Sequence, residues 1–262
     1  MTDRRTHRMG QIFLINKDIA KMEAEHARDK HVLEIGPGPG ILTEELCKLA
    51  KKVVAVEKDR RLYRELKSTL HSKKLVLINK DFLDATDEEV LLKDTDIVIS
   101  NVPYSISGKV IGWLSDRNMQ AVLCLQKEFV DHMLAKENTR DYSKLSVITS
   151  LSFRVTKIYE VSRGNFRPIP KVDSTIIYIK PLSSGMTARE SVIIGALMQH
   201  KKKRLKNAIE DSRKSLGLDR NDIQKLSSNL ENGEERLFKM PPQKILETAR
   251  KIFEYQKEKD SS

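Results

Sequence analysis

The 262-residue sequence has few of the features that mark secreted, membrane or metal-binding proteins. Its only cysteines, Cys47 and Cys124, lie in a helical and an apolar strand pattern, so we expect buried thiols in a reducing, cytoplasmic compartment. No apolar run approaches the length of a membrane span, and residues 1–8 lack the apolar core of a signal peptide. The six histidines show no metal-ligand spacing with cysteine. These absences predict a cytoplasmic protein with no metal and no membrane partner.

The sequence also contains fewer acidic than basic residues. The chain has 48 Lys and Arg against 37 Asp and Glu, which gives a net charge of +11. Such an excess indicates a polyanionic partner, and without a membrane-spanning run nucleic acid is favoured over a membrane surface. The length suits one large domain followed by a small one.

A glycine-rich turn follows the first predicted strand, His31–Ile35. The turn Gly36-Pro-Gly38-Pro-Gly40 leads at once into a helical pattern. In this arrangement the backbone comes close to a bound nucleotide or nucleoside. The third glycine comes one residue too early for G-x-G-x-x-G, so a ligand without a pyrophosphate is favoured. A plain tight turn is the alternative at this point.

Acidic residues follow the next two predicted strands. Glu57 ends the strand Lys52–Val56, 21 residues after Gly36, where a carboxylate can accept both hydroxyls of a ribose. Asp81 follows the third strand and can accept from an adenine amino group, with Phe82 packing on the ring. The alternatives are a helix-capping role for Glu57 and an ordinary loop acid beside a core aromatic for Asp81.

The tetrapeptide Asn101-Val-Pro-Tyr104 ends an apolar run, Asp96–Ser100, that predicts a buried strand. Open α/β sheets have their ligand crevice at such a position. Asn101 offers a side-chain carbonyl, and Pro103 holds the backbone carbonyl of Val102 in place. Tyr104 supplies a π-face. Together they suit a flat substrate with an exocyclic amine; a polar turn with Tyr104 in the core is the alternative.

An extended segment, Arg163–Ser174, contains two prolines and places Phe166 between two arginines. A loop aromatic flanked by arginine suggests base stacking with phosphate contact, and a lid over the core is the equal alternative. The segment is followed by a last predicted strand, Thr175–Ile179. Strands that alternate with helices in this way predict a doubly wound, largely parallel sheet.

Beyond a linker predicted at residues 183–185 the chain is nearly all helical in pattern. Its densest basic stretch contains Lys201, Lys202, Lys203 and Arg204. We expect these residues to contact nucleic acid, with a solvated helix face as the alternative. The tail Lys257–Ser262 is expected to be disordered.

Together these motifs resemble the S-adenosylmethionine-dependent methyltransferases of Rossmann-like fold, and most closely the KsgA-type adenine dimethyltransferases of small-subunit ribosomal RNA. Two positions depart from that family: Val102 stands where leucine is usual, and Ile12 where a polar residue is frequent. The resemblance is carried by Glu34–Thr43, Glu57, Asp81 and Asn101–Tyr104, and by Gly10-Gln11, Phe13-Leu14, Leu125–Glu128, Tyr142–Ser146, Phe166–Ser174 and Lys202–Asn207.

The resemblance implies an α/β fold with a seven-stranded Rossmann-like catalytic domain in residues 1–184 and a small all-helical, RNA-contacting domain in residues 185–262. It implies a monomer that methylates N6 of small-subunit rRNA adenosines, two adjacent ones near the 3′ end, late in ribosome biogenesis on an immature 30S-type particle. The implied cofactor site is Gln11, Ile12, Leu14, Gly36, Gly38, Glu57, Asp81, Phe82 and Asn101. The implied catalytic residues are Asn101, Val102, Pro103, Tyr104 and Phe166.

Other functions remain open at this point. A 23S rRNA adenine methyltransferase of the macrolide-resistance type shares the core, and a non-catalytic rRNA-binding assembly factor shares the fold. A DNA adenine methyltransferase lacks the Phe166–Ser174 and basic patterns. An NAD-dependent oxidoreductase gives no reason for Asn101–Tyr104.

Overall fold

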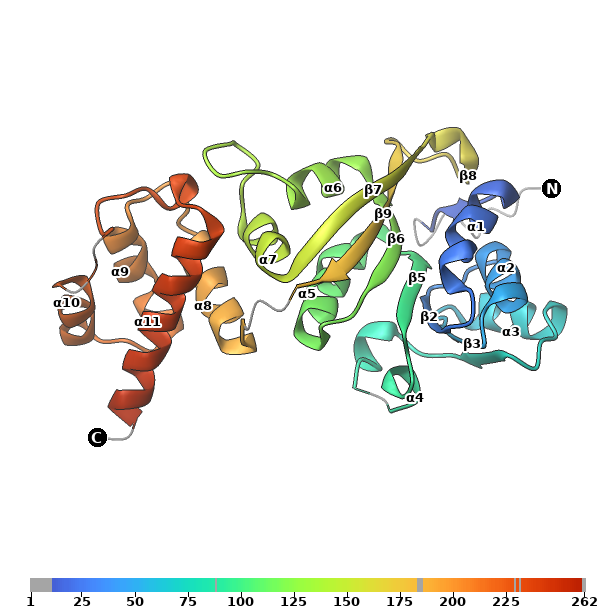
Figure 1. Cartoon of the computed structure of the whole chain (residues 1–262), viewed down its shortest axis with the longest axis horizontal. Helices are drawn as coiled ribbons and strands as arrows, with labels where there is room; N and C mark the ends of the chain where they lie inside the picture. The colour runs from blue at the N-terminus through green and yellow to red at the C-terminus, as the bar shows by residue number, and fades with distance from the viewer. Residues whose placement is uncertain (1–10, 88, 183–185, 229, 231, 261–262) are drawn as a thin grey trace. The chain divides into compact units, whose positions relative to one another are not determined.

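The computed structural model describes residues 11–87, 89–182, 186–228, 230 and 232–260. The chain divides into two compact units, which Figure 1 shows in sequence colours. Of the described residues, the first unit takes in those up to Val130 together with Arg154–Pro181, and the second takes in Asp131–Phe153 and those from Leu182 on. The chain therefore leaves the first unit and returns to it. The predicted boundary between residues 184 and 185 lies within a segment outside the described residues and stays a prediction.

The first unit is built on a seven-stranded sheet in the order β4-β3-β2-β5-β6-β9-β7. Strands β4, β3, β2, β5 and β6 pair in parallel, and β9 pairs antiparallel with β6. This sheet confirms the predicted α/β class and the seven strands. Its strands are β2 (His31–Ile35), β3 (Lys52–Val56), β4 (Leu75–Ile78), β5 (Ile97–Asn101), β6 (Ala121–Gln126), β7 (Phe153–Val161) and β9 (Ser174–Pro181).

The strand order reverses beside β2. From β2 the chain continues to β3 and β4 on one side, and then crosses to β5 and β6 on the other. An open α/β sheet has its ligand crevice at such a switch point, outside the carboxyl ends of the strands. The central strands are mostly apolar, as expected for strands covered on both faces: Leu33, Val53 and Val98 are all fully buried.

Helices join these strands. The α-helices of the first unit are α1 (Lys17–Ala24), α2 (Ile41–Leu49), α3 (Arg60–Thr69), α4 (Glu89–Leu92) and α5 (Ser107–Arg117), and α6 (Lys127–Met133) follows β6 at the border of the units. Short 3₁₀ turns lie at Glu25–Ala27, Phe82–Asp84, Tyr104–Ile106 and Arg163–Asn165.

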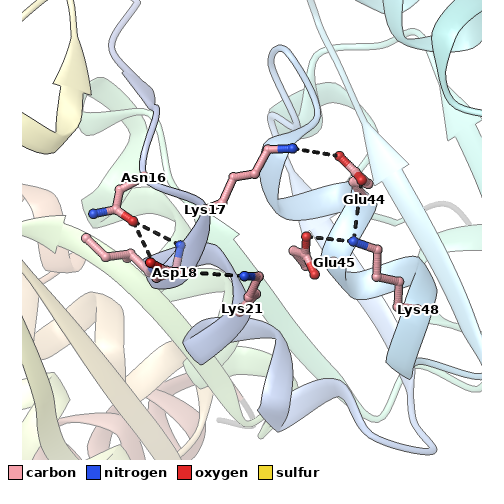
Figure 2. A network of polar contacts seen from close by, with 8 residues as sticks. Asn16, Lys17, Asp18, Lys21, Glu44, Glu45 and Lys48 are labelled. Carbon is pink, nitrogen blue, oxygen red and sulfur yellow. Dashed lines mark hydrogen bonds and ion pairs between the residues drawn. The ribbon is translucent and has the colours of Figure 1, made fainter.

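Helix α1 begins at Lys17 because the Asn16 side chain caps it, accepting from the backbone N–H of Asp18 at 2.9 Å. Figure 2 shows that Lys17 reaches across to Glu44 on α2, a nitrogen–oxygen distance of 3.9 Å. Exposed pairs of this kind contribute only about 0–1 kcal/mol. The buried face of α1, which packs against α2, therefore fixes the position of this helix.

A separate two-stranded sheet joins the start of the described chain to the Phe166 segment. Strand β1 (Phe13–Leu14) pairs antiparallel with β8 (Phe166–Arg167), and Leu14 lies opposite Phe166. The backbone N–H of Ile15 also donates to the carbonyl of Asn165 at 2.9 Å. Two segments that the sequence singled out for different ligands are thus hydrogen-bonded neighbours.

The second unit is helical, as predicted for the C-terminal part. Its helices are α7 (Lys144–Ser152), α8 (Ala188–Met198), α9 (Leu205–Leu216), α10 (Arg220–Ser228) and α11 (Pro242–Asp260), with a 3₁₀ turn at Leu237–Lys239. The buried Tyr142 hydroxyl donates to the carbonyl of Met240 at 2.9 Å and so ties the segment before α7 to the segment before α11. Among the described residues, no helix is long and apolar enough to cross a membrane.

One expectation for the end of the chain is wrong. Residues Lys257–Asp260 were expected to be disordered, but they continue helix α11. Lys259 explains the continuation, because its ammonium donates to the buried carboxylate of Asp222 at 2.6 Å. Residues 261–262, like the predicted linker at 183–185, lie outside the described residues.

Candidate active site

A cavity of about 400 Å³ lies in the first unit. It takes residues from the ends of β2, β3 and β5, so it occupies the crevice that the strand order predicts. The lining residues are Gln11, Ile12, Phe13, Ile35, Gly36, Val56, Glu57, Lys58, Asp81, Phe82, Asn101, Val102, Pro103, Tyr104, Ser105, Ile106, Cys124 and Phe166.

Two of the residues predicted for this site, Gly38 and Leu14, are not part of the lining. Gly38 lies directly behind it, with its backbone N–H donating to Glu57 at 3.0 Å. Leu14 is buried in the core next to Phe166. The remaining predicted cofactor and catalytic residues all line the cavity, and their roles stay predictions.

The carboxylate of Glu57 is held by the backbone. One oxygen accepts from Gly38 N–H at 3.0 Å and the other from Asp59 N–H at 2.8 Å. Burial raises the pKa of Glu57, and these two hydrogen bonds act in the opposite direction. A carboxylate oxygen can accept more than one hydrogen bond, so both oxygens keep room for a ligand hydroxyl.

The glycine turn needs its glycine at position 38. Gly38 has φ +56°, and a Cβ there would lie 2.8 Å from the Phe13 ring. Gly36 has φ +70°, and the absence of its Cβ leaves space for Pro103, since a Cβ there would lie 3.2 Å from the proline ring. Backbone conformation and close approach both favour glycine here. The turn therefore packs against β1 on one side and the Asn101–Tyr104 loop on the other.

Asp81 also lines the cavity, and its carboxylate already has hydrogen-bond partners within the protein. One carboxylate oxygen accepts from Lys58 Nζ at 2.6 Å, and the other accepts from the N–H of Leu83 at 3.0 Å. The hydrogen bond from Lys58 is the main reason that the pKa of Asp81 is lowered. Asp81 is thus an ionised acceptor, and a ligand amine would share it with Lys58.

The Asn101 amide is the most informative group in the cavity. Its Nδ2 donates to the Glu23 carboxyl at 3.2 Å, while its Oδ1 is buried and has no hydrogen-bond partner among the described residues. Buried polar atoms are almost always paired, so an unpaired acceptor on a residue that lines the cavity is a candidate partner for a ligand donor.

The two aromatic residues proposed to hold a base differ in their surroundings. The Tyr104 hydroxyl lies 2.8 Å from Ser174 Oγ, which is fully buried on β9. Phe166 is 3% exposed and belongs to the core cluster, yet it also lines the cavity. Phe166 is thus a core residue that also lines the cavity, and its contact with a base stays a prediction.

Some lining residues were not predicted. Phe13 follows directly after Gln11 and Ile12, and Lys58 follows Glu57, so both are neighbours of predicted residues. Cys124 lies opposite Asn101 in the pairing of β5 with β6. The apolar run of β6 could not single it out, because buried strands of parallel sheets are apolar on both faces.

The basic stretch of the second unit lies outside the helices, and its contact with nucleic acid stays a prediction. Residues 201–204 form a turn between α8 and α9, so the description of them as a helix face is wrong. Lys201 Nζ donates to the carbonyls of Arg140 at 2.9 Å and Tyr142 at 2.6 Å, which makes it part of the fold. Two of its neighbours are paired as well: Lys203 with Asp211 and Arg204 with Glu234.

Lys202 is the exception in this stretch. Its side chain is exposed and forms no ion pair among the described residues. It is therefore the member of the stretch best placed to meet a phosphate.

Comparisons with known proteins agree with this geometry. The family described as "Ribosomal RNA adenine dimethylase" matches residues 2–240. A protein of Thermococcus sibiricus named "Probable ribosomal RNA small subunit methyltransferase A" is 36% identical over 241 residues, which cover 88% of this chain and 86% of that protein.

Solved structures show the same likeness. A dimethyladenosine transferase from Plasmodium falciparum is 28% identical with a TM-score of 0.75, over 93% of this chain and 98% of the other. The 23S rRNA methyltransferase ErmE covers the same shares at 23% identity and a TM-score of 0.57, which shows a common fold and nothing finer.

Proposed function

The chain belongs to the ribosomal RNA adenine dimethylase family, and from this premise we propose which residues of its cavity hold the methyl donor and the target base. The enzyme is an S-adenosylmethionine-dependent rRNA adenine dimethyltransferase. The 23S alternative is not favoured, because the likeness to ErmE extends to the fold alone.

The first half of the cavity fits S-adenosylmethionine. Glu57 offers two fixed carboxylate oxygens to the ribose hydroxyls, and Asp81 offers an ionised acceptor to the adenine amine. Phe82 gives the adenine an apolar neighbour, and Gln11 and Ile12 close the outer side. When bound, S-adenosylmethionine supplies an electrophilic methyl group on a positively charged sulfur.

The Asn101–Tyr104 loop fits the target amine. N6 of adenine is a weak nucleophile, because its lone pair is delocalised into the ring. Hydrogen bonds from its two N–H groups to Asn101 Oδ1 and to the carbonyl of Val102 favour tetrahedral character at nitrogen. The lone pair is then free to point at the methyl group. Fixed acceptors of this kind accelerate a reaction through alignment and electrostatics, without a strong base.

The target base lies between aromatic surfaces in this proposal. Tyr104, anchored by its hydroxyl contact with Ser174, offers one face, and Phe166 is proposed for the other. The adenosine leaves its stack to enter the cavity. After the first transfer the amine keeps a single N–H, so the second transfer uses one acceptor of the pair.

The substrate is proposed to be small-subunit rRNA within an immature particle, with Lys202 in contact with a phosphate. One observation carries the whole assignment: Asn101 lines the same cavity as Glu57 and Asp81, and its buried Oδ1 has no hydrogen-bond partner among the described residues. A cavity for a dinucleotide gives no reason for such an acceptor.

The test combines methylation with binding. The protein is incubated with labelled S-adenosylmethionine and immature small-subunit particles, naked small-subunit rRNA or 23S rRNA, and modified adenosines are mapped. We expect N6,N6-dimethyladenosine in small-subunit rRNA only, and calorimetric binding of S-adenosylmethionine but not of NAD. Label confined to 23S rRNA, or binding of NAD alone, would contradict the proposal.

A further inference from the structure

Helix α1 has one acidic residue on its buried face. Ile19, Ala20, Ala24 and, just beyond the helix, Ala27 are at most 6% exposed, and Glu23 lies among them at 1%. A buried carboxyl costs several kcal/mol of desolvation unless a partner compensates for it. A residue at this position needs a reason beyond packing, because an apolar side chain would serve packing better.

The partner of Glu23 lies in the active site. One of its carboxyl oxygens accepts from Asn101 Nδ2 at 3.2 Å, and the other is buried without a hydrogen-bond partner among the described residues. The carboxyl of Glu34 on β2 and the thiol of Cys124 on β6 also interact electrostatically with the Glu23 carboxyl. Among the groups that interact with Glu23, Asn101 is the one that donates a hydrogen bond to it, and its side-chain amide has two different ends.

We propose that Glu23 is a positioning residue for methyl transfer: it accepts from Asn101 Nδ2 and thereby holds Oδ1 toward the target amine. The inference rests on the function proposed above for Asn101. It assigns a role to a residue that does not line the cavity.

The chemistry of the amide explains why its orientation matters. The oxygen and the NH₂ of asparagine differ little in shape, so an unrestrained amide can exchange them by rotation. With Oδ1 toward N6, the amide accepts an N–H and leaves the nitrogen lone pair free. With Nδ2 toward N6, it would donate to that lone pair and compete with the methyl group. Glu23 stabilises the first orientation and disfavours the second.

This role does not require a charge on Glu23. Burial, the largest cause, raises the pKa of its carboxyl to about 8. At neutral pH the protonated form therefore prevails, and with the proton on Oε1, which has no partner among the described residues, Oε2 is a carbonyl oxygen that still accepts from Asn101 Nδ2. A neutral isostere with a carbonyl should consequently replace it.

The test compares two substitutions of similar size. Glu23→Gln keeps a carbonyl acceptor, and Glu23→Met removes it. Single-turnover methylation at saturating S-adenosylmethionine should be slowed by less than about threefold in the Gln variant and by about tenfold in the Met variant, the effect of one lost hydrogen bond. Calorimetric affinity for S-adenosylmethionine should stay within about twofold of wild type in both.

A matched control comes from helix α2. Glu45 is 7% exposed and pairs with Lys48 at 2.7 Å, so it is a second buried acid in the same unit without contact to Asn101. Glu45→Met should leave the methylation rate unchanged. If Glu23→Met does not fold, Glu23→Leu provides the same comparison.

A double mutant separates positioning from general damage. Because Glu23 acts through Asn101, Glu23→Met should add no further loss in an Asn101→Ala background. A further tenfold loss there, equal slowing by Gln and Met, or a wild-type rate for Met would each overturn the inference. A wild-type rate for Asn101→Ala itself would instead refute the proposed function of the loop, so the two failures are distinguishable.

Discussion

Raising the pH through neutrality should destabilise the first unit, because two of its buried acids must lose their protons. Glu23 and Glu34 are 1% and 2% exposed, and burial is the largest cause that raises the pKa of each from 4.5 to about 8. In the unfolded chain both ionise near their ordinary value. Between these values the native state holds two protons that the unfolded state has released. This stability is therefore fully present below pH 4.5 and is lost as the pH rises through about 8.

The size of the effect follows from linkage. Each retained proton changes the free energy of unfolding by about 1.4 kcal/mol per pH unit. For two groups, a rise from about pH 6.5 to about pH 7.5 should remove about 2 kcal/mol, since the native acids begin to ionise near the upper end. The comparison starts at about pH 6.5 because of His26, whose pKa is lowered from 6.5 by burial. Below that pH, His26 makes the free energy of unfolding rise with pH, opposite to the effect of the two acids. A domain stable by about 5–15 kcal/mol shows such a loss clearly.

The only tryptophan provides the assay. Trp113 lies on α5 in the first unit and is 6% exposed, so its fluorescence reports the unfolding of that unit. Urea midpoints are measured at several pH values, for the wild type and for Glu23→Met. The midpoint should fall with rising pH, and the variant should show about half the slope. A midpoint that stays constant or rises over this range would refute the reasoning.

Three further predictions concern ligands. Gly38→Ala should lower the affinity for S-adenosylmethionine by about tenfold in calorimetry, because alanine costs about 1 kcal/mol at positive φ and its Cβ would displace Phe13. An unchanged affinity would show that the turn tolerates the displacement of Phe13. Lys202→Glu should weaken rRNA binding and reduce its salt slope by about one without affecting the cofactor, and a filter-binding series that matches wild type at low salt would contradict the phosphate contact. Cofactor binding should change the emission of Trp113, because Phe82 lines the cavity and lies edge-on to the indole at 5.1 Å; a flat titration beside positive calorimetry would place the adenine elsewhere.

The core of the fold was predictable because its strands are short apolar runs between turn residues. The predicted strands His31–Ile35 and Lys52–Val56 have the same bounds in the structure. The division into units was harder, because Asp131–Phe153 joins the helical unit through contacts distant in sequence, such as Tyr142 with Met240. Local pattern carries no information on such pairings.

For the site, the sequence supplied the groups and the structure supplied their orientation. Glu57, Asp81 and Asn101 follow strand ends, so topology alone brings them together. That Asp81 is already engaged by Lys58 depends on side-chain positions across two loops. Glu23 could have been noticed, since an acid interrupts the apolar stripe of its helix, but its partner lies 78 residues away.

The place of β9 in the sheet has a consequence for a chain that emerges from the ribosome one residue at a time. Strand β6 pairs with β9 along six residues, from Ala121 to Gln126, and β9 begins only at Ser174. Until that strand is synthesised, this edge of β6 is open and the wall of the cavity lacks support. Ser174 also brings the hydroxyl that anchors Tyr104. The nascent chain thus acquires the contact that holds the Tyr104 hydroxyl only when about two thirds of its residues have been made.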